Sequence, residues 1–223
     1  MSDGPVEPRQ FAVCLSGGSG VAYGQRLVEV LLGLGHLVHL TATSAALRVL
    51  VHEVGVVVDP ERPDLAALFA PALRGRLRVH ALDAVEAAPA SGSAGIAATI
   101  VVPCSMGTLA RVAHGFSSNL VERAADVALK EGRPLVVVPR ETPLSTLHLE
   151  NMLKLAKLGA IVLPAMPGFY HRPTTVAAMV DFVVGKILDR VRVVHTLVPR
   201  WQTPTQSSPW DEGEVDGPGG RAP

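Results

Sequence analysis

The sequence predicts an α/β fold built on a doubly wound parallel sheet. Apolar runs of strand length alternate with segments of helical periodicity over most of the chain, which is the pattern of repeated β-α units. The longest apolar run, residues 96–103, shows no polar alternation, as expected of a strand that helices cover on both faces. Together these two observations favour a three-layer sandwich with helices on both sides of one sheet.

The individual elements follow from periodicity and from the residues that interrupt it. Strands are predicted at residues 11–15, 37–42, 77–81, 96–103, 134–138 and 160–164. Helices are predicted at residues 21–34, 45–52, 106–113, 119–130, 147–158 and 176–191. Three prolines break up segment 55–76, which receives no element, and small polar residues make 87–95 a loop. This order is typical of Rossmann-like and flavodoxin-like folds.

The length of 223 residues fits one domain with tails. Residues 1–10 are predicted to be a flexible N-terminus, 11–201 the α/β domain, and 202–223 a disordered tail rich in Pro, Ser, Gly and charge. Twenty basic and twenty acidic residues balance, and aromatic residues make up 4%, so nothing predicts a nucleic-acid partner. No apolar run reaches the roughly 18 residues of a membrane span.

The loop at residues 16–20, Ser-Gly-Gly-Ser-Gly, follows the first strand and opens a helix. Glycines let a ligand approach the backbone, and a helix N-terminus offers N–H groups to an anion. Close packing of strand and helix is the other explanation for such glycines. No Lys-Ser/Thr follows, which excludes a triphosphate loop. The second strand ends in hydroxyl residues rather than an acid, which favours a mononucleotide such as FMN over NAD or FAD.

Charged side chains gather after the later strands. Arg123 and Lys130 lie seven residues apart on nearly one helix face, where they either bind a phosphate or form a solvated surface pair. Arg140 and Glu141 directly follow a strand, and Tyr170 follows the last one. Several charge-assisted contacts could hold a phosphate ester, and Glu141 could transfer a proton or only pair with Arg140.

Neither a metal centre nor a disulfide framework is predicted. His148 and His171 have no second ligand at helical spacing, and the two cysteines, Cys14 and Cys104, lie in or just after apolar strands. Buried, reduced cysteines fit a cytoplasmic protein.

These stretches closely resemble the flavin prenyltransferases of UbiX type. The resemblance runs from Phe11 to about Trp201, and the stretches that carry it are residues 16–23, 90–93, 103–109, 119–130, 139–155, 159–172, 180–188 and 197–201. It implies that residues 11–201 bind flavin, and that the protein joins a dimethylallyl group from dimethylallyl phosphate to N5 and C6 of reduced FMN without a metal. It also implies that the prenylated FMN serves a UbiD-type decarboxylase, and that the protein is a cytoplasmic homo-oligomer, a dodecamer by family resemblance.

The resemblance also implies roles for individual residues. The expected catalytic residues are Ser19, Glu141 and Lys130. The expected FMN-binding residues are Gly17, Gly18, Ser19, Thr43, Ser105, Met106, Thr108 and Arg123. The residues expected to bind dimethylallyl phosphate are Ser91, Arg123, Lys130, Arg140, Tyr170, Lys186 and Trp201, with Trp201 supplied by a neighbouring subunit.

Two positions depart from the family pattern. Lys186 stands where relatives commonly have Arg, which keeps the charge and loses bidentate phosphate binding. Ser44 stands where many relatives have Lys. Three other readings stay open: a cysteine decarboxylase of the same fold, a decarboxylase of aromatic acids, and a non-catalytic flavin carrier.

Overall fold

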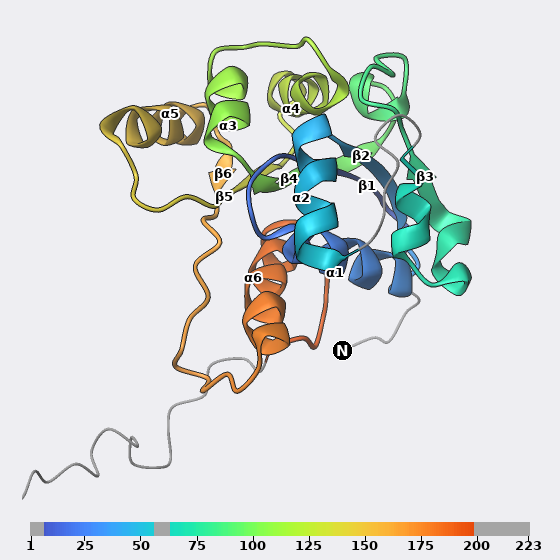
Figure 1. The fold of residues 1–223 in the computed structure, drawn as a ribbon. Helices are drawn as coiled ribbons and strands as arrows, with labels where there is room; N and C mark the ends of the chain where they lie inside the picture. Colours follow the sequence, from blue (N-terminus) through green and yellow to red (C-terminus); the bar gives the residue numbers. More distant parts are fainter. Residues whose placement is uncertain (1–6, 56–62, 199–223) are drawn as a thin grey trace, which may run out of the picture.

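Six parallel strands form one sheet in the computed structural model, which describes residues 7–55 and 63–198 (Figure 1). They are β1 (Gln10–Leu15), β2 (Leu37–Ala42), β3 (Leu77–Val79), β4 (Ile96–Cys104), β5 (Leu135–Pro139) and β6 (Ile161–Val162). Their order is β3-β2-β1-β4-β5-β6, and every neighbouring pair is parallel. This is the doubly wound order of Rossmann-like folds, so the predicted fold class is confirmed.

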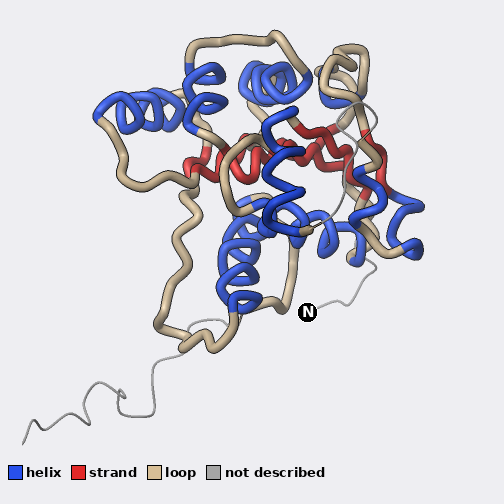
Figure 2. The backbone as a smooth tube through the Cα atoms, in the orientation of Figure 1, coloured by secondary structure: helices blue, strands red, loops and turns tan. Residues whose placement is uncertain are grey.

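Helices cover both faces of the sheet. Figure 2 shows the strands as a layer between α3 (Met106–Ala113), α4 (Leu120–Lys130) and α5 (Thr146–Lys157) on one side and α1 (Val21–Gly33) and α6 (Val176–Arg190) on the other. The helix α2 (Ser44–Val54) stands in front of the sheet in this view. Each face has its own apolar core.

The two cores follow from the alternation of side chains along the strands. Val13 of β1 and Ile100 of β4 belong to the core under α1 and α6, whereas their neighbours Cys14 and Val101 belong to the core under α3 and α4. All four side chains are buried. The central strands are therefore apolar on both faces, as the uninterrupted run at 96–103 predicted.

Side-chain caps explain where the helices begin. Five helices have an N-cap residue whose side chain accepts a hydrogen bond from a backbone N–H of the first turn. These residues are Thr43 for α2, Ser105 for α3, Asn119 for α4, Ser145 for α5 and Thr175 for α6. Each helix therefore starts within one residue of its predicted start.

The edges of the sheet differ most from prediction. β3 and β6 are shorter than residues 77–81 and 160–164, although backbone hydrogen bonds to the neighbouring strand continue past them, from the amide of His80 to Leu40 and from the amide of Leu163 to Val137. Three short 3₁₀ helices, Leu65–Leu68, Pro71–Arg76 and Ala88–Ala90, occupy segments that received no element. Residues 1–6 and the expected tail at 202–223 lie outside the described residues.

One part of the molecule exposes many apolar side chains. Only Asn151 and Leu155 of α5 are buried, and Figure 1 shows α5 and the segment after β6 standing away from the body. The exposed large apolar residues here are Leu147, Leu149, Leu153, Leu158, Met166, Phe169, Tyr170 and Val176. Such a surface marks an interaction site. Among the described helices, none is long and apolar enough to cross a membrane.

Candidate functional site

Ser16 joins the ends of the two central strands. It is fully buried after β1, and its hydroxyl donates to the carbonyl oxygen of Pro103 at 3.0 Å. The same hydroxyl accepts from the amide of Ser105 at 2.7 Å. The loops that follow β1 and β4 are thereby fixed side by side at the switch point of the sheet, where doubly wound proteins bind ligands.

Gly17 and Gly18 lie in this junction, and Gly17 leaves no room for a side chain. A Cβ at Gly17 would be 2.5 Å from Cβ of Ala45, and one at Gly18 would be 3.4 Å from Cβ of Pro103. The loop therefore packs tightly against α2 and the end of β4, so close packing accounts for part of the glycine pattern. The same closeness leaves a narrow cradle of backbone at the place predicted to bind FMN.

The side chain of Glu53 reaches from α2 to the N-terminus of α1, where the sequence predicted N–H groups available to an anion. One carboxylate oxygen accepts from the amides of Gly20 at 2.9 Å and Val21 at 3.0 Å. Burial raises the pKa of Glu53, but hydrogen bonds from the Ser19 side chain and these amides, with Arg140 nearby, outweigh it and lower the pKa overall. The expectation that these N–H groups are free is therefore wrong in this structure.

Sequence reasoning missed Glu53 as a site residue. It lies in the last turn of α2, where a negative charge opposes the dipole of its own helix. A carboxylate in such a place signals a partner elsewhere, and here the partner is the loop after β1.

Arg140 reaches the same loop from the end of β5. Its Nε donates to the carbonyl oxygen of Ser19 at 3.2 Å. Glu141 is exposed, and its Oε1 accepts from the amide of Thr142 at 3.1 Å. Across the described residues, no ion pair joins Glu141 to Arg140. The structure therefore brings Ser19, Arg140 and Glu53 together, with Glu141 next to them in sequence and open to solvent.

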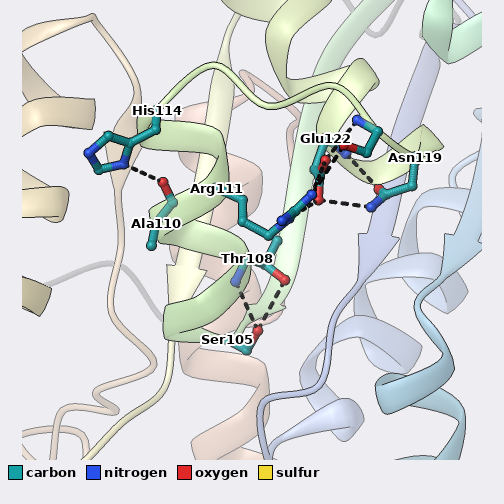
Figure 3. Close-up of polar contacts among 8 residues, drawn as sticks. Ser105, Thr108, Ala110, Arg111, His114, Asn119 and Glu122 are labelled. Carbon is teal, nitrogen blue, oxygen red and sulfur yellow. Dashed lines mark hydrogen bonds and ion pairs between the residues drawn. The ribbon is translucent and has the colours of Figure 1, made fainter.

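Hydroxyl groups line two helix N-termini at this edge. The Thr43 hydroxyl accepts from the amide of Ala46 at 3.1 Å at the start of α2. At the start of α3, the Ser105 hydroxyl donates to the Thr108 hydroxyl at 3.0 Å (Figure 3). Met106 beside them is buried. Thr43 and Thr108 each act as an acceptor in these bonds, so each keeps its hydroxyl proton for a ligand.

A buried carboxylate fixes the connection between α3 and α4. Glu122 accepts from the Arg111 guanidinium, the Ser118 amide and the Asn119 side chain (Figure 3). Burial raises the pKa of Glu122, and these donors outweigh it and lower the pKa overall. The neighbouring Arg123 pairs with Asp126 at 3.2 Å. Glu122 therefore has a structural role that orients the first turn of α4.

Ser91 and Lys130 lie at the opposite edge of the sheet. α4 runs from the carboxyl edge toward the amino edge, because β5 begins shortly after it. Lys130 is thus roughly 10 Å beyond Arg123 along the axis, at about 1.5 Å per residue. The loop of Ser91 precedes β4 and contacts the end of α4 through Arg133. Within one protomer these two predicted ligands are separated from Arg140 by the length of the strands.

Tyr170 and Lys186 lie near a shared aromatic ring. Phe182 makes an edge contact with Tyr170, with centroids 5.7 Å apart, and the Lys186 ammonium lies 5.5 Å from the Phe182 centroid. The ring of His171 stacks on the ring of Phe182. Lys186 lines a cavity of about 330 Å³ beside β6. Trp201 lies outside the described residues.

The histidines and cysteines give no metal centre. The described residues contain no group of three or more His, Cys, Asp or Glu side chains placed to hold a metal ion. Burial raises the pKa of the Cys14 thiol to about 12 and also raises the pKa of Cys104. Both thiols are therefore protonated and unreactive at neutral pH.

Comparisons with known proteins agree with the sequence resemblance. The Flavoprotein family matches residues 3–202. The flavin prenyltransferase UbiX of Alkalihalophilus pseudofirmus is 50% identical over 191 residues, which cover 86% of this chain and 95% of that protein.

Two solved structures share the fold over nearly their whole length. The crystal structure of AnUbiX in complex with FMN and dimethylallyl pyrophosphate is 34% identical with a TM-score of 0.77, covering 88% of this chain and 99% of that one. A dodecameric FMN-dependent UbiX-like decarboxylase from Escherichia coli O157:H7 is 38% identical with a TM-score of 0.76, covering 87% and 100%.

Proposed function

The chain belongs to the Flavoprotein family and within it to the UbiX flavin prenyltransferases, and we propose from this premise that it joins a dimethylallyl group to N5 and C6 of reduced FMN. The donor is dimethylallyl phosphate, whose phosphate departs as the new carbon–nitrogen bond forms. The prenylated FMN then passes to a UbiD-type decarboxylase. The observation that carries this proposal is 50% identity over 95% of a named flavin prenyltransferase.

The carboxyl edge of the sheet fits FMN. FMN supplies the nucleophilic N5 and the ring carbon C6. On this chain, Gly17 and Gly18 form the backbone cradle at the switch point, and the hydroxyls of Thr43 and Thr108 keep a proton for an acceptor. The side chain of Ser19 bonds to Glu53, which fixes its hydroxyl beside the cradle. This arrangement supports Ser19 as the residue next to N5.

The donor phosphate needs several cations. Arg140, Lys130 and Lys186 carry fixed positive charge, and a phosphate leaving group gains negative charge as its bond to carbon breaks, so these contacts strengthen during the reaction. Lys186 supplies a point charge instead of the fork of an arginine. Tyr170 and Ser91 add hydroxyl donors.

We assign proton transfer to Glu141. Its carboxylate is exposed at the carboxyl edge and accepts only one backbone amide bond among the contacts of the described residues, so lone pairs remain for a proton. Closing the fourth ring of the product requires the loss of a proton from C6. Lys130 assists departure of the phosphate.

The separation of the two edges supports a site shared between copies. Lys130 and Ser91 lie at the amino edge and Arg140 at the carboxyl edge, so one phosphate can meet all three only if different subunits supply them. The exposed apolar residues of α5 and the following segment provide a surface for such assembly. We propose that the protein is a cytoplasmic homo-oligomer and that its full assembly is a dodecamer. In this assembly Trp201 from a neighbouring subunit would cover the prenyl pocket.

The decisive experiment is the mass of the flavin after incubation with reduced FMN and dimethylallyl phosphate. The proposal predicts a product heavier than reduced FMN by one dimethylallyl group less one hydrogen, together with free phosphate and no added metal. The group replaces the hydrogen on N5, and on ring closure the alkene gains a proton while C6 loses one. Unchanged FMN in the presence of both substrates would refute it. Release of CO₂ from a cysteine-containing peptide or an aromatic acid would instead favour a decarboxylase.

A further inference from the structure

We propose that Glu131 and Arg133 are positioning residues that hold Ser91 and Lys130 in one half-site for the donor phosphate. The inference rests on the proposed function, which makes Ser91 and Lys130 ligands of that phosphate. Neither Glu131 nor Arg133 needs to touch the donor. Both act through the loop at residues 91–93 at the amino edge of the sheet.

Arg133 ties the loop to the end of α4. Its Nη2 donates a short hydrogen bond to the carbonyl oxygen of Gly92. Its Nη1 is enclosed and finds no partner within the described part of the chain. The guanidinium is therefore held against the loop instead of lying free in solvent, and it fixes the backbone next to Ser91.

Glu131 packs against the same glycine. A Cβ at Gly92 would lie 2.7 Å from Cδ of Glu131 and 3.3 Å from its Cγ. Any side chain at position 92 would therefore push the Glu131 carboxylate away. Glycine is needed here for the approach of a carboxylate rather than for an unusual backbone angle.

The carboxylate in turn holds the predicted phosphate cation. Lys130 Nζ lies 2.8 Å from Glu131 Oε1, which uses one of the three ammonium donors and leaves two for a phosphate. With Arg133 nearby, the three charges sum to one positive charge, so the cluster still attracts an anion. Ser91 and Ser93 share a hydrogen bond of 3.1 Å across the loop.

The stability of α4 does not explain why residue 131 is acidic. It is the C-cap residue of α4, where a negative charge opposes the helix dipole. A residue chosen for the helix alone would be neutral or basic. The arrangement is explained if the carboxylate serves to position Lys130 and the loop.

Binding of dimethylallyl phosphate to the FMN-loaded oligomer tests the proposal, with FMN kept oxidised so that no turnover occurs. Calorimetry should show Gly92→Ala and Glu131→Gln binding the donor roughly tenfold more weakly, the loss expected for one charge-assisted contact. Arg133→Gln should behave likewise, and Arg133→Lys should recover part of the affinity. FMN affinity should stay near the wild-type value.

A double variant gives the sharpest outcome. Removal of the Glu131 carboxylate abolishes the clash at position 92. Gly92→Ala in a Glu131→Ala background should therefore cause no further loss of affinity for dimethylallyl phosphate. The matched control is Arg76→Gln, which removes another arginine bond to a glycine carbonyl, that of Gly35, and should leave donor binding unchanged.

Four results would overturn the positioning role. They are unchanged donor affinity in Gly92→Ala and Glu131→Gln, tighter donor binding in Glu131→Gln, full additivity in the double variant, or an equal loss of FMN affinity, which would indicate general disruption. If wild-type protein binds the donor but forms no prenylated flavin, the proposed function fails while the positioning role stands on the binding data.

Discussion

Replacing Glu53 by Gln should weaken the junction between α2 and the loop after β1. The carboxylate accepts from the amides of Gly20 and Val21 and from the side chain of Ser19. Gln keeps one acceptor oxygen and the shape of the side chain, but it removes the negative charge from the N-terminus of α1 and places an amide NH₂ toward backbone donors.

The expected loss is modest because Glu53 is partly exposed. A charge at a helix N-terminus contributes roughly 0.3–1 kcal/mol, and solvent screening reduces the worth of each charged hydrogen bond. We expect the free energy of unfolding at pH 7 to fall by about 1–2 kcal/mol. For a chain of this size that corresponds to a decrease in Tm of roughly 3–6 °C.

The pH dependence of stability distinguishes the effect of the negative charge of Glu53 from the effect of its side-chain shape. The pKa of Glu53 is lower in the folded protein than its ordinary value of 4.5, so its stabilising effect is present above that value and is lost as the pH falls through the folded pKa. Melting curves of FMN-free wild type and Glu53→Gln should therefore differ above about pH 5 and converge in more acidic solution.

The matched control is Glu29→Gln, which removes an acid from an exposed pair with Arg26 on α1 and should change stability by less than about 0.5 kcal/mol. Equal stability of wild type and Glu53→Gln at pH 7 would refute the reasoning. A stability difference that persists unchanged to low pH would show that the charge plays no part.

The remaining predictions concern the ligands and the thiols. Lys186→Ala should weaken binding of dimethylallyl phosphate much more than binding of FMN, as measured by titration of each ligand, and equal losses would contradict the assignment. Glu141→Gln should keep FMN bound and slow turnover by roughly 10²–10⁴, with accumulation of an N5-only adduct, which is an isomer of the product and is therefore identified by its absorption spectrum; wild-type turnover would remove Glu141 from the mechanism. Native protein should resist alkylation at pH 8, because burial raises the pKa of Cys14 to about 12 and also raises that of Cys104; rapid labelling would show that the central strands open. The purified protein should carry FMN and no stoichiometric metal, which absorbance and elemental analysis check; a dinucleotide or zinc in place of FMN would count against it.

The fold could be predicted because its signals are local. The apolar run at 96–103 became the central strand β4, and hydroxyl or amide residues at the predicted helix starts became N-caps, as Ser105 and Asn119 show. The edge strands were predicted longer than β3 and β6, which end at Val79 and Val162 even though single backbone hydrogen bonds to the neighbouring strand continue beyond them. Strand length at an edge depends on pairing, which periodicity does not report.

For the candidate site, the sequence could place only the residues that lie in one loop relative to the neighbouring strand. The glycine loop and its closeness to residues 103–108 followed from the parallel fold. The contact between Glu53 and Gly20 spans 33 residues, and no local pattern joins them. Seven-residue spacing placed Arg123 and Lys130 on one helix face, but spacing alone did not show that each pairs with a carboxylate close to it in sequence, Asp126 and Glu131.

Mixed oligomers test the central claim that two edges of the sheet, from different copies, form one prenyltransferase site. Arg140→Ala damages the carboxyl edge and Lys130→Ala the amino edge, and each variant alone should lose most prenylated-flavin formation. Subunits of the two variants would be unfolded together, reassembled with FMN, and assayed for product by mass. A random equal mixture should regain activity, because about a quarter of the sites pair two intact edges. Mixed oligomers that form normally yet make no more product than either variant alone would contradict the claim.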